Sequence, residues 1–337
     1  MKLLSELIVE LEGKELYNEI TDPPIRDIAY DSRQVIPGSL FVCIRGLRTD
    51  GHLYVREALS RGALAVVSER LLLLPAGIPG VLVPDTRLAL AQMGAAFHGY
   101  PGRQLRVIGI TGTNGKTSST HFLEAILSGW GKKTGLLGTI TNRLGGRKLP
   151  SSLTTPESLD LQGFLAEMVR KECSYMVMEV SSHALSLLRV QETEFDIGVF
   201  TNLTRDHLDF HRDFEDYREA KGILFKQLGL GEKKSPKYAV MNGDDPHCNY
   251  YRQITRVPVY TYGIKKNSDF QAEEVRITPK SASFNLEKFS ERIYLRVTGL
   301  FSVYNALAAI AVAVREGVPP EIIAGALRDF PGVPGRF

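Results

Sequence analysis

A glycine-rich stretch at residues 107–117, V-I-G-I-T-G-T-N-G-K-T, constrains the fold more than any other part of the sequence. Residues 105–110 read as a buried strand, and a helix is expected from residue 116 to residue 130. A loop in this position turns backbone N–H groups toward phosphate oxygens, while Lys116 reaches the terminal phosphates and the Thr117 hydroxyl binds Mg²⁺. The stretch predicts a nucleotide-binding α/β domain. Its glycines depart slightly from the usual spacing, so an ordinary glycine-rich turn with a surface lysine is the alternative.

Strands separated by helices follow this loop, and this order predicts a doubly wound, mostly parallel sheet. The other expected elements are helices at 158–172, 214–228 and 301–315 and strands at 135–140, 175–180, 197–200 and 238–241. Polar and apolar residues alternate between 269 and 297, which predicts an antiparallel appendage. Strands at 63–68 and 80–83 and a helix at 87–98 predict a small N-terminal α/β domain. We therefore expect domains at residues 1–100 and 101–332.

The composition indicates a protein without a nucleic-acid or membrane partner. The 337 residues carry 41 basic and 38 acidic side chains, and a net charge of +3 is too small for the strong positive field of a nucleic-acid binder. No apolar run is long enough for a membrane span, and the N-terminus does not resemble a signal peptide. Cys43, Cys173 and Cys248 lie far apart in the sequence, which argues against a disulfide framework or a thiolate zinc site. We expect a soluble, cytoplasmic protein.

Two polar clusters follow predicted strands, at the edge where open α/β sheets bind ligands. The first, residues 178–183, contains Glu179, a candidate metal ligand; taken alone, a solvated carboxylate at a strand end is the simpler interpretation. The second, residues 201–211, brings two imidazoles and two carboxylates close together, which suits a hard or borderline cation. A plain helix N-terminus has the same pattern.

The stretch T-T-P-E at residues 154–157 reads as a helix start. It offers a threonine cap, a proline at the first helical position and a glutamate in the first turn. The same helix start would also present backbone N–H groups to an anionic substrate.

Together these stretches resemble the Mur ligase superfamily, ATP-dependent amide-forming enzymes of cell-wall synthesis, and within it the step that adds a third residue to UDP-MurNAc-L-Ala-D-Glu. The resemblance spans nearly the whole chain and rests on D-S-R-Q-V-I-P-G-S-L-F-V at 31–42, D-G-H at 50–52, G-T-N-G-K-T at 112–117, T-T-P at 154–156, M-E-V-S-S-H-A-L at 178–185, N-L-T-R-D-H-L-D-F-H at 202–211, Y-R-E-A-K at 217–221 and N-G-D-D-P at 242–246. Several members share the loop at 112–117, but the combination with 31–42, 154–156 and 178–185 is more specific to this step.

The resemblance implies three groups of site residues. The nucleotide would be bound by Gly112, Thr113, Asn114, Gly115, Lys116, Thr117, Ser118, Asn305 and Arg336. The UDP-sugar peptide would be bound by Ser32, Arg33, His52, Thr154, Thr155, Ser182 and Arg189. The catalytic residues would be Lys116, Glu179, His207 and Lys221, and the magnesium ligands Thr117, Glu179, His207 and the carbamate of Lys221. Ser302 stands where relatives often carry asparagine, which weakens the expectation of a nucleotide contact there.

Carbamylation of Lys221 is implied by the resemblance and has a physical reason. An ammonium group, with a pKa of about 10.4, cannot bind Mg²⁺, whereas its CO₂ adduct is a carboxylate on a long arm. Without the motif, a solvated helix lysine is the default interpretation of Lys221.

The implied reaction begins with ATP, which converts the D-Glu side-chain carboxylate into an acyl phosphate. The amine of meso-diaminopimelate or L-lysine then attacks, and the protein contributes mainly positioning and electrostatic stabilisation. ATP and Mg²⁺ are the expected cofactors, and a monomer is expected.

Relatives carry a third, C-terminal domain, and residues 333–337 match its beginning. We therefore expect that the isolated chain binds the UDP-sugar dipeptide but ligates poorly, and the choice between diaminopimelate and lysine depends on a motif in that domain. Two alternatives remain open: another ATP-dependent amide ligase similar to folylpolyglutamate synthase, and a nucleotide-operated binding module without chemistry.

Overall fold

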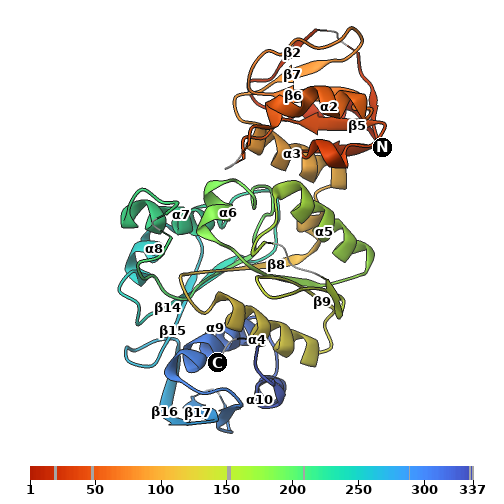
Figure 1. The fold of residues 1–337 in the computed structure, drawn as a ribbon. Coiled ribbons are helices and arrows are strands. Elements are labelled where there is room, and N and C mark those ends of the chain that lie inside the picture. The colour runs from red at the N-terminus through yellow and green to blue at the C-terminus, as the bar shows by residue number, and fades with distance from the viewer. Residues whose placement is uncertain are drawn as a thin grey trace. The chain divides into compact units, whose positions relative to one another are not determined.

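The chain divides into two compact units (Figure 1). The structure is a computed structural model, and it describes residues 1–18, 21–46, 49–149, 153–207, 209–287, 289–333 and 335. The first unit comprises Met1–Pro101, Glu157–Gly163 and Leu187–Glu192. The second comprises Gly102–Pro156, Phe164–Ser186 and Thr193–Phe337.

A five-stranded sheet in the order β2-β7-β6-β5-β4 organises the first unit. Its strands are β2 (Glu15–Tyr17), β4 (Asp27–Ala29), β5 (Ser39–Val42), β6 (Ala65–Ser68) and β7 (Gly80–Leu82), and the unit also contains α1 (Leu4–Ile8), α2 (Val55–Ser60), α3 (Thr86–His98) and the short pair β1 (Lys2–Leu3) and β3 (Pro24–Ile25). All sheet neighbours are parallel except β2 and β7. Every residue of β5 and β6 is buried, as expected for apolar strands inside a parallel sheet.

An eleven-stranded sheet in the order β11-β10-β9-β12-β8-β13-β14-β15-β16-β17-β18 organises the second unit. Its strands are β8 (Arg106–Thr111), β9 (Thr134–Leu137), β10 (Asn142–Leu144), β11 (Arg147–Leu149), β12 (Tyr175–Glu179), β13 (Ile197–Phe200), β14 (Tyr238–Asn242), β15 (Val259–Gly263), β16 (Phe270–Thr278), β17 (Ser281–Leu286) and β18 (Ile293–Leu295). The strands from β9 to β16 in this order are parallel, and antiparallel strands extend both edges. The predicted α/β class, with a mostly parallel sheet and an antiparallel appendage, is therefore confirmed.

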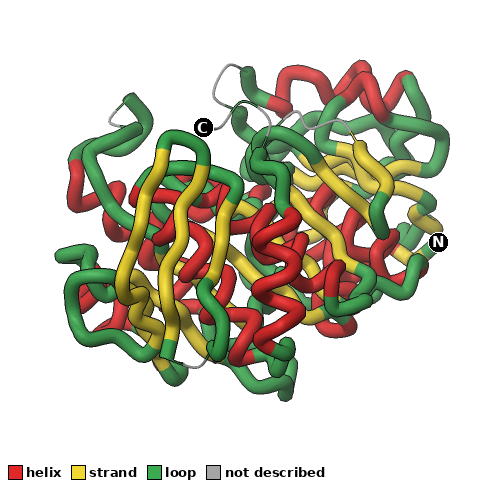
Figure 2. Tube along the Cα trace, turned by 90° about the horizontal axis from the view of Figure 1, so that it is seen from below, coloured by secondary structure: helices red, strands yellow, loops and turns green. Residues whose placement is uncertain are grey.

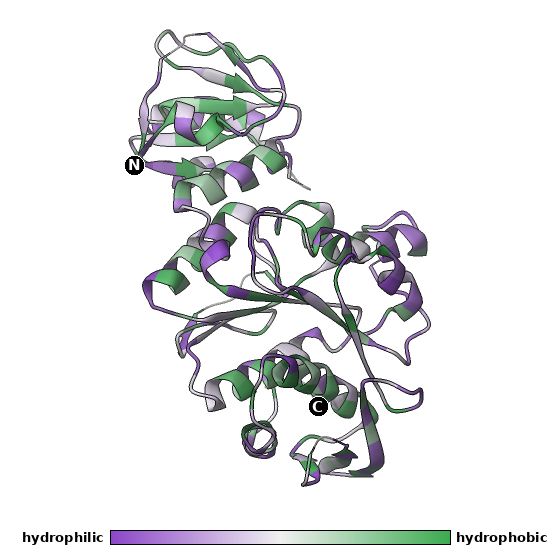
Figure 3. Ribbon diagram, turned by 180° about the vertical axis from the view of Figure 1, so that it is seen from behind, coloured by the Kyte–Doolittle hydropathy of each residue, from purple (hydrophilic) through white to green (hydrophobic). Residues whose placement is uncertain are grey.

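Helices cover both faces of this sheet. They are α4 (Lys116–Gly129), α5 (Ser158–Arg170), α6 (Ser182–Ser186), α7 (Phe214–Gln227), α8 (Cys248–Ile254), α9 (Leu300–Arg315) and α10 (Pro320–Asp329). Figure 1 shows α4 and α9 below the strands and α6 and α7 above them, and the view from below in Figure 2 shows helices in front of part of the sheet. The lower helices are largely hydrophobic in Figure 3, and α9 buries most of its residues, chiefly in the main core.

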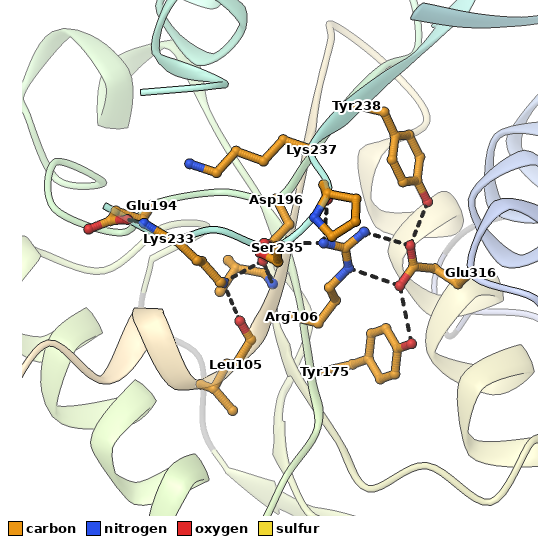
Figure 4. Close-up of polar contacts among 12 residues, drawn as sticks. Leu105, Arg106, Tyr175, Glu194, Asp196, Lys233, Ser235, Lys237, Tyr238 and Glu316 are labelled. Carbon is orange, nitrogen blue, oxygen red and sulfur yellow. Dashed lines mark hydrogen bonds and ion pairs between the residues drawn. The ribbon is translucent and has the colours of Figure 1, made fainter. Parts of the chain in front are cut away.

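A network of buried charges lies where strands β8, β12, β13 and β14 begin (Figure 4). Arg106 forms ion pairs with Glu316 at 2.8 Å and with the fully buried Asp196 at 3.2 Å, and Lys233 also pairs with Asp196. The hydroxyls of Tyr175 and Tyr238 donate to Glu316. This network ties together the N-terminal ends of these four strands. Their carboxyl ends lie on the opposite side of the sheet.

Two further expectations concern cysteines and membranes. The three cysteines are free and buried. Within the described ranges, no helix combines the length and the apolar character needed to cross a membrane.

Candidate active site

The loop between β8 and α4 depends on two glycines that no other residue can replace without strain. Gly112 and Gly115 have φ angles of 146° and 88°, which side-chain-bearing residues rarely adopt. A Cβ at Gly112 would lie 1.9 Å from the Thr201 hydroxyl oxygen, and a Cβ at Gly115 would lie 2.2 Å from Oδ1 of Asn305. The predicted nucleotide residue Asn305 therefore packs directly against the loop.

The start of α4 has the features of an anion site. The first four N–H groups of a helix have no acceptor within the helix, and no side chain caps α4. Thr117 and Ser118 lie in this first turn, and Thr117 is buried. Lys116 Nζ donates to the carbonyl oxygens of Gly112 and Thr113, both at 2.8 Å, so its ammonium group lies over the loop.

Asn202 fixes the loop from the neighbouring strand β13, and our sequence analysis did not name it as a site residue. Its side chain accepts from the Asn114 N–H at 2.9 Å and donates to the Asn114 carbonyl at 3.0 Å. Its carbonyl accepts from the Thr113 N–H at 2.8 Å. The signal was present, because Asn202 opens the polar cluster that follows β13.

Glu179 ends β12, which lies beside β8 in the sheet. Only 1% of Glu179 is exposed, so a solvated carboxylate is the wrong interpretation. Its carboxylate accepts from the Thr117 hydroxyl at 2.9 Å and from the Thr139 N–H at 2.8 Å. A Cβ at Gly138 would lie 2.4 Å from Glu179 Oε1, so glycine is needed there for the carboxylate to reach the loop.

Lys221 approaches the same loop from α7. It is 1% exposed, so a solvated helix lysine is also the wrong interpretation. Its Nζ donates to the Gly112 carbonyl at 3.0 Å and lies 4.5 Å from the centre of the Tyr217 ring. Burial, reinforced by the positive charge of Lys116, holds the pKa of Lys221 well below its usual value. The structure therefore favours a neutral amine at Lys221.

His207 is partly exposed, with 42% of its side chain accessible. Its ring centre lies 5.1 Å from that of His183 and 6.0 Å from that of Tyr217, the ring on which Lys221 lies. Among the described residues, this site included, no group of three or more His, Cys, Asp or Glu side chains forms a ready-made metal site. The predicted magnesium set contains only two such side chains, together with Thr117 and a modified Lys221.

Thr154, Thr155 and Ser182 lie beside the end of β12. The Thr155 hydroxyl donates to the Glu179 carbonyl at 2.9 Å, and the hydroxyl oxygens of Thr154 and Thr139 are 3.1 Å apart. The buried Ser182 hydroxyl has no hydrogen-bond partner in the described part of the chain. Ser182 therefore has hydrogen-bonding capacity for a ligand.

The other predicted substrate residues belong to the first unit. Arg33, with 78% of its side chain exposed, pairs with Asp31 at 2.7 Å, and Ser32 donates to Glu57 at 2.8 Å. Arg189 pairs with Glu157 at 2.8 Å.

His52 is fully enclosed within the first unit. Its Nδ1 lies 2.6 Å from Asp50, and its Nε2 accepts from the Glu69 N–H at 3.0 Å. Because Nε2 accepts, Nδ1 carries the proton. Both ring nitrogens are thus already used.

Arg336 lies outside the described residues. The Ser302 hydroxyl donates to the Thr298 carbonyl at 2.7 Å, so it is engaged at the start of α9.

Two family models match this chain. The model described as the Mur ligase middle domain matches residues 110–313, and the one described as Mur ligase family, catalytic domain, matches residues 24–98. The chain belongs to the Mur ligase family. The resemblance based on sequence motifs is therefore confirmed.

Similar Mur ligases include proteins from Geobacillus thermodenitrificans and Syntrophomonas wolfei, both named UDP-N-acetylmuramoyl-L-alanyl-D-glutamate--2,6-diaminopimelate ligase. They are 47% and 45% identical to this chain over 94% and 100% of its length. The chain spans 65% and 68% of these two relatives.

Solved Mur ligase structures share the fold. A structure with the same ligase name has a TM-score of 0.79 at 29% identity and covers 93% of this chain and 64% of its own. MurF from Acinetobacter baumannii has a TM-score of 0.72 at 26% identity, over 99% of this chain and 69% of its own. Folylpolyglutamate synthase from Mycobacterium tuberculosis, at 17% identity and a TM-score of 0.59 over 74% of this chain and 64% of its own, shares the fold alone.

Proposed function

We propose that this chain provides the ATP-binding and UDP-substrate-binding parts of a cytoplasmic ligase of peptidoglycan synthesis. The ligase would join meso-diaminopimelate to UDP-N-acetylmuramoyl-L-Ala-D-Glu through an acyl phosphate. The observation that carries this proposal is the convergence of Thr117, Glu179 and Lys221 on one glycine loop. The names of the relatives favour diaminopimelate over L-lysine as the added residue.

ATP would place its phosphates at the start of α4. The loop residues from Gly112 to Ser118 supply N–H groups and hydroxyls, and Asn305 packs against the loop from α9. Lys116 would leave the carbonyls of Gly112 and Thr113 and turn toward the β and γ phosphates. This movement would place its positive charge where negative charge develops during phosphoryl transfer.

The residues beside the loop suit magnesium, because Mg²⁺ prefers oxygen ligands. Thr117 and Glu179 already lie within hydrogen-bonding distance, and they would hold the first ion. His207 and the carbamate of Lys221 would hold a second. Bound Mg²⁺ would neutralise charge on the transferring phosphoryl group.

The environment of Lys221 supports carbamylation. The nitrogen lone pair of a neutral amine attacks the carbon of CO₂, the nitrogen loses a proton to solvent, and an N-carboxylate forms. Burial lowers the pKa of Lys221, so it favours the neutral form of the amine whose lone pair reacts.

The UDP-sugar dipeptide would use both domains. The domain at residues 1–100 would bind the uridine end with the exposed Arg33, while Ser32 and His52 would shape that site from within. The domain at residues 101–332 would bind the muramyl peptide near Thr154, Thr155 and Ser182. Arg189 would contribute a positive charge for the pyrophosphate.

Calorimetric titration tests this proposal against its alternatives. We expect the 337-residue chain to bind MgATP and UDP-MurNAc-L-Ala-D-Glu, and we expect Lys116→Ala to weaken only the first. Binding of a folate in place of the UDP-sugar would instead indicate a folylpolyglutamate synthase-like ligase. If MgATP and the UDP-sugar bind, but phosphate release measured in the presence of the C-terminal domain never depends on the UDP-sugar and diaminopimelate, the chain is a binding module.

A further inference from the structure

Tyr217 connects three parts of the site and has no role in the chemistry described above. It lies on α7, one turn before Lys221, and it is fully buried. The Lys221 Nζ lies 4.5 Å from the centre of its ring, and the His207 ring centre lies 6.0 Å away. Its hydroxyl oxygen is 3.1 Å from the Thr113 hydroxyl oxygen in the phosphate loop.

Hydrogen accounting at Thr113 shows which group donates. A threonine hydroxyl has one hydrogen and two lone pairs. The Thr113 hydroxyl lies 3.1 Å from the Thr204 carbonyl, to which it donates, and it accepts from the Thr204 N–H at 3.0 Å. The second lone pair remains, so Tyr217 donates to Thr113. Removal of this O–H would leave the Thr113 lone pair without a donor in a buried environment.

We propose that Tyr217 is a positioning residue that keeps the phosphate loop and Lys221 in a fixed relation to each other. Its hydroxyl holds the loop through Thr113, and its ring holds the side chain of Lys221. A displacement of the loop therefore moves the Tyr217 hydroxyl, and the ring carries that movement to Lys221. The catalytic importance of this connection rests on the proposed function, whereas the connection itself does not.

The test variant is Tyr217→Phe, which keeps the ring and removes only the hydroxyl. Tyr251→Phe is the matched control, because Tyr251 is equally buried and its hydroxyl donates to the Arg218 carbonyl of α7 at 3.1 Å, away from the loop. Each variant removes the one hydroxyl hydrogen bond of a buried tyrosine, so we expect similar losses of thermal stability.

Hydrogen exchange of the loop amides at residues 112–115 gives a readout that general destabilisation does not reproduce. We expect exchange to accelerate about five- to tenfold in Tyr217→Phe relative to Tyr251→Phe, as expected for one lost hydrogen bond. The dissociation constant for MgATP should rise by a similar factor. If loop exchange is the same in both variants, the positioning role is wrong.

The two hypotheses fail in different ways. If the wild-type chain does not bind MgATP, the proposed function is wrong, and hydrogen exchange still decides the role of Tyr217. If MgATP binds normally and Tyr217→Phe behaves like Tyr251→Phe in both measurements, only the positioning role is overturned.

Discussion

Lys221 lies in surroundings that disfavour its charged form. Its pKa is depressed chiefly by burial, so between the depressed value and the usual value of 10.5 the unfolded chain binds a proton that the folded chain does not. Stability therefore rises with pH across this window, and below it the buried charge carries a constant penalty. We predict that Lys221→Met is more stable than wild type near neutral pH and that its advantage shrinks as the pH rises toward 10.5.

Chemical denaturation in CO₂-depleted buffer, repeated at several pH values, measures this difference. Lys226→Met, on the exposed side of the same helix, is the control and should show no comparable trend. A Lys221→Met variant that is less stable than wild type at every pH would contradict the prediction.

His52 is predicted to act through structure, because both of its ring nitrogens bond to neighbouring residues. We expect His52→Ala to lower the free energy of unfolding of the first unit by about 1–3 kcal/mol, since the Asp50 carboxylate and the Glu69 N–H lose a partner. The affinity for the UDP-sugar should fall only in proportion to the fraction of the first unit that is unfolded. A loss of affinity with unchanged stability would instead indicate direct contact with the substrate.

The two ends of helix α4 each carry a glycine, and the two glycines differ in the space around them. Gly115 precedes the helix and Gly131 follows it, and both have positive φ, at 88° and 78°. An added Cβ at Gly115 would lie 2.2 Å from Asn305, whereas nothing lies within 4 Å of one at Gly131. Both alanine variants should incur the strain of a left-handed residue, roughly 1–2 kcal/mol, and only Gly115→Ala should also disrupt the loop.

Isothermal titration with MgATP separates these effects. We expect Gly115→Ala to lose most nucleotide affinity and Gly131→Ala to retain it. The double variant Gly115→Ala with Asn305→Gly should recover the loop geometry, visible as restored hydrogen-exchange protection. Equal affinity in the two alanine variants would show that Asn305 does not constrain the loop.

The charged network at the N-terminal ends of the central strands depends on Asp196. Its removal leaves Arg106 and Lys233 buried without this partner (Figure 4). We predict that Asp196→Ala costs about 3–5 kcal/mol of unfolding free energy, the usual result of breaking a buried pair. Urea denaturation measures this cost, and Glu172→Gln, in the exposed pair with Lys133, should change little. A similar effect of the two substitutions would contradict a structural role for the network.

The central elements could be predicted because their patterns are long and strongly apolar. Strand β8 and helix α4 begin within one residue of the predicted positions, and β13 matches its predicted range. Helix α10 was missed, although its apolar residues lie on one face and the buried Ile323 and Leu327 are one turn apart. The hairpin β10–β11 was also missed, although Gly145 and Gly146 between polar strands are a recognisable turn signal.

The single tryptophan of the chain is a fluorescence probe for one of the two units. Trp130 follows α4 in the second unit, so its fluorescence reports the unfolding of the unit that contains the phosphate loop. We predict that MgATP at one hundred times its dissociation constant adds about 2.7 kcal/mol to the stability of this unit. Lys116→Ala should require much more nucleotide for the same shift. An equal shift in both proteins would show that nucleotide binds elsewhere.

The spatial proximity of segments distant in the sequence could be predicted only where the order of strands in the sheet determines it. Glu179 and the loop follow adjacent parallel strands, so their proximity could be inferred from strand order. The environments of Lys221 and Tyr217 could not be inferred in this way, because a helix pattern does not specify which carbonyl or ring a buried polar side chain meets. The depressed pKa of Lys221 depends on that detail, because its first cause is burial.

One carbonyl in the loop serves both lysines. The Gly112 oxygen accepts from Lys116 and Lys221 at once, and a carbonyl oxygen has two lone pairs. When Lys116 turns toward a triphosphate, one lone pair of the Gly112 oxygen loses its donor. When Lys221 becomes a carbamate, its Nζ keeps a single hydrogen. Nucleotide entry should therefore recruit a water molecule behind the loop, and solvent would belong to the assembled site as a structural component.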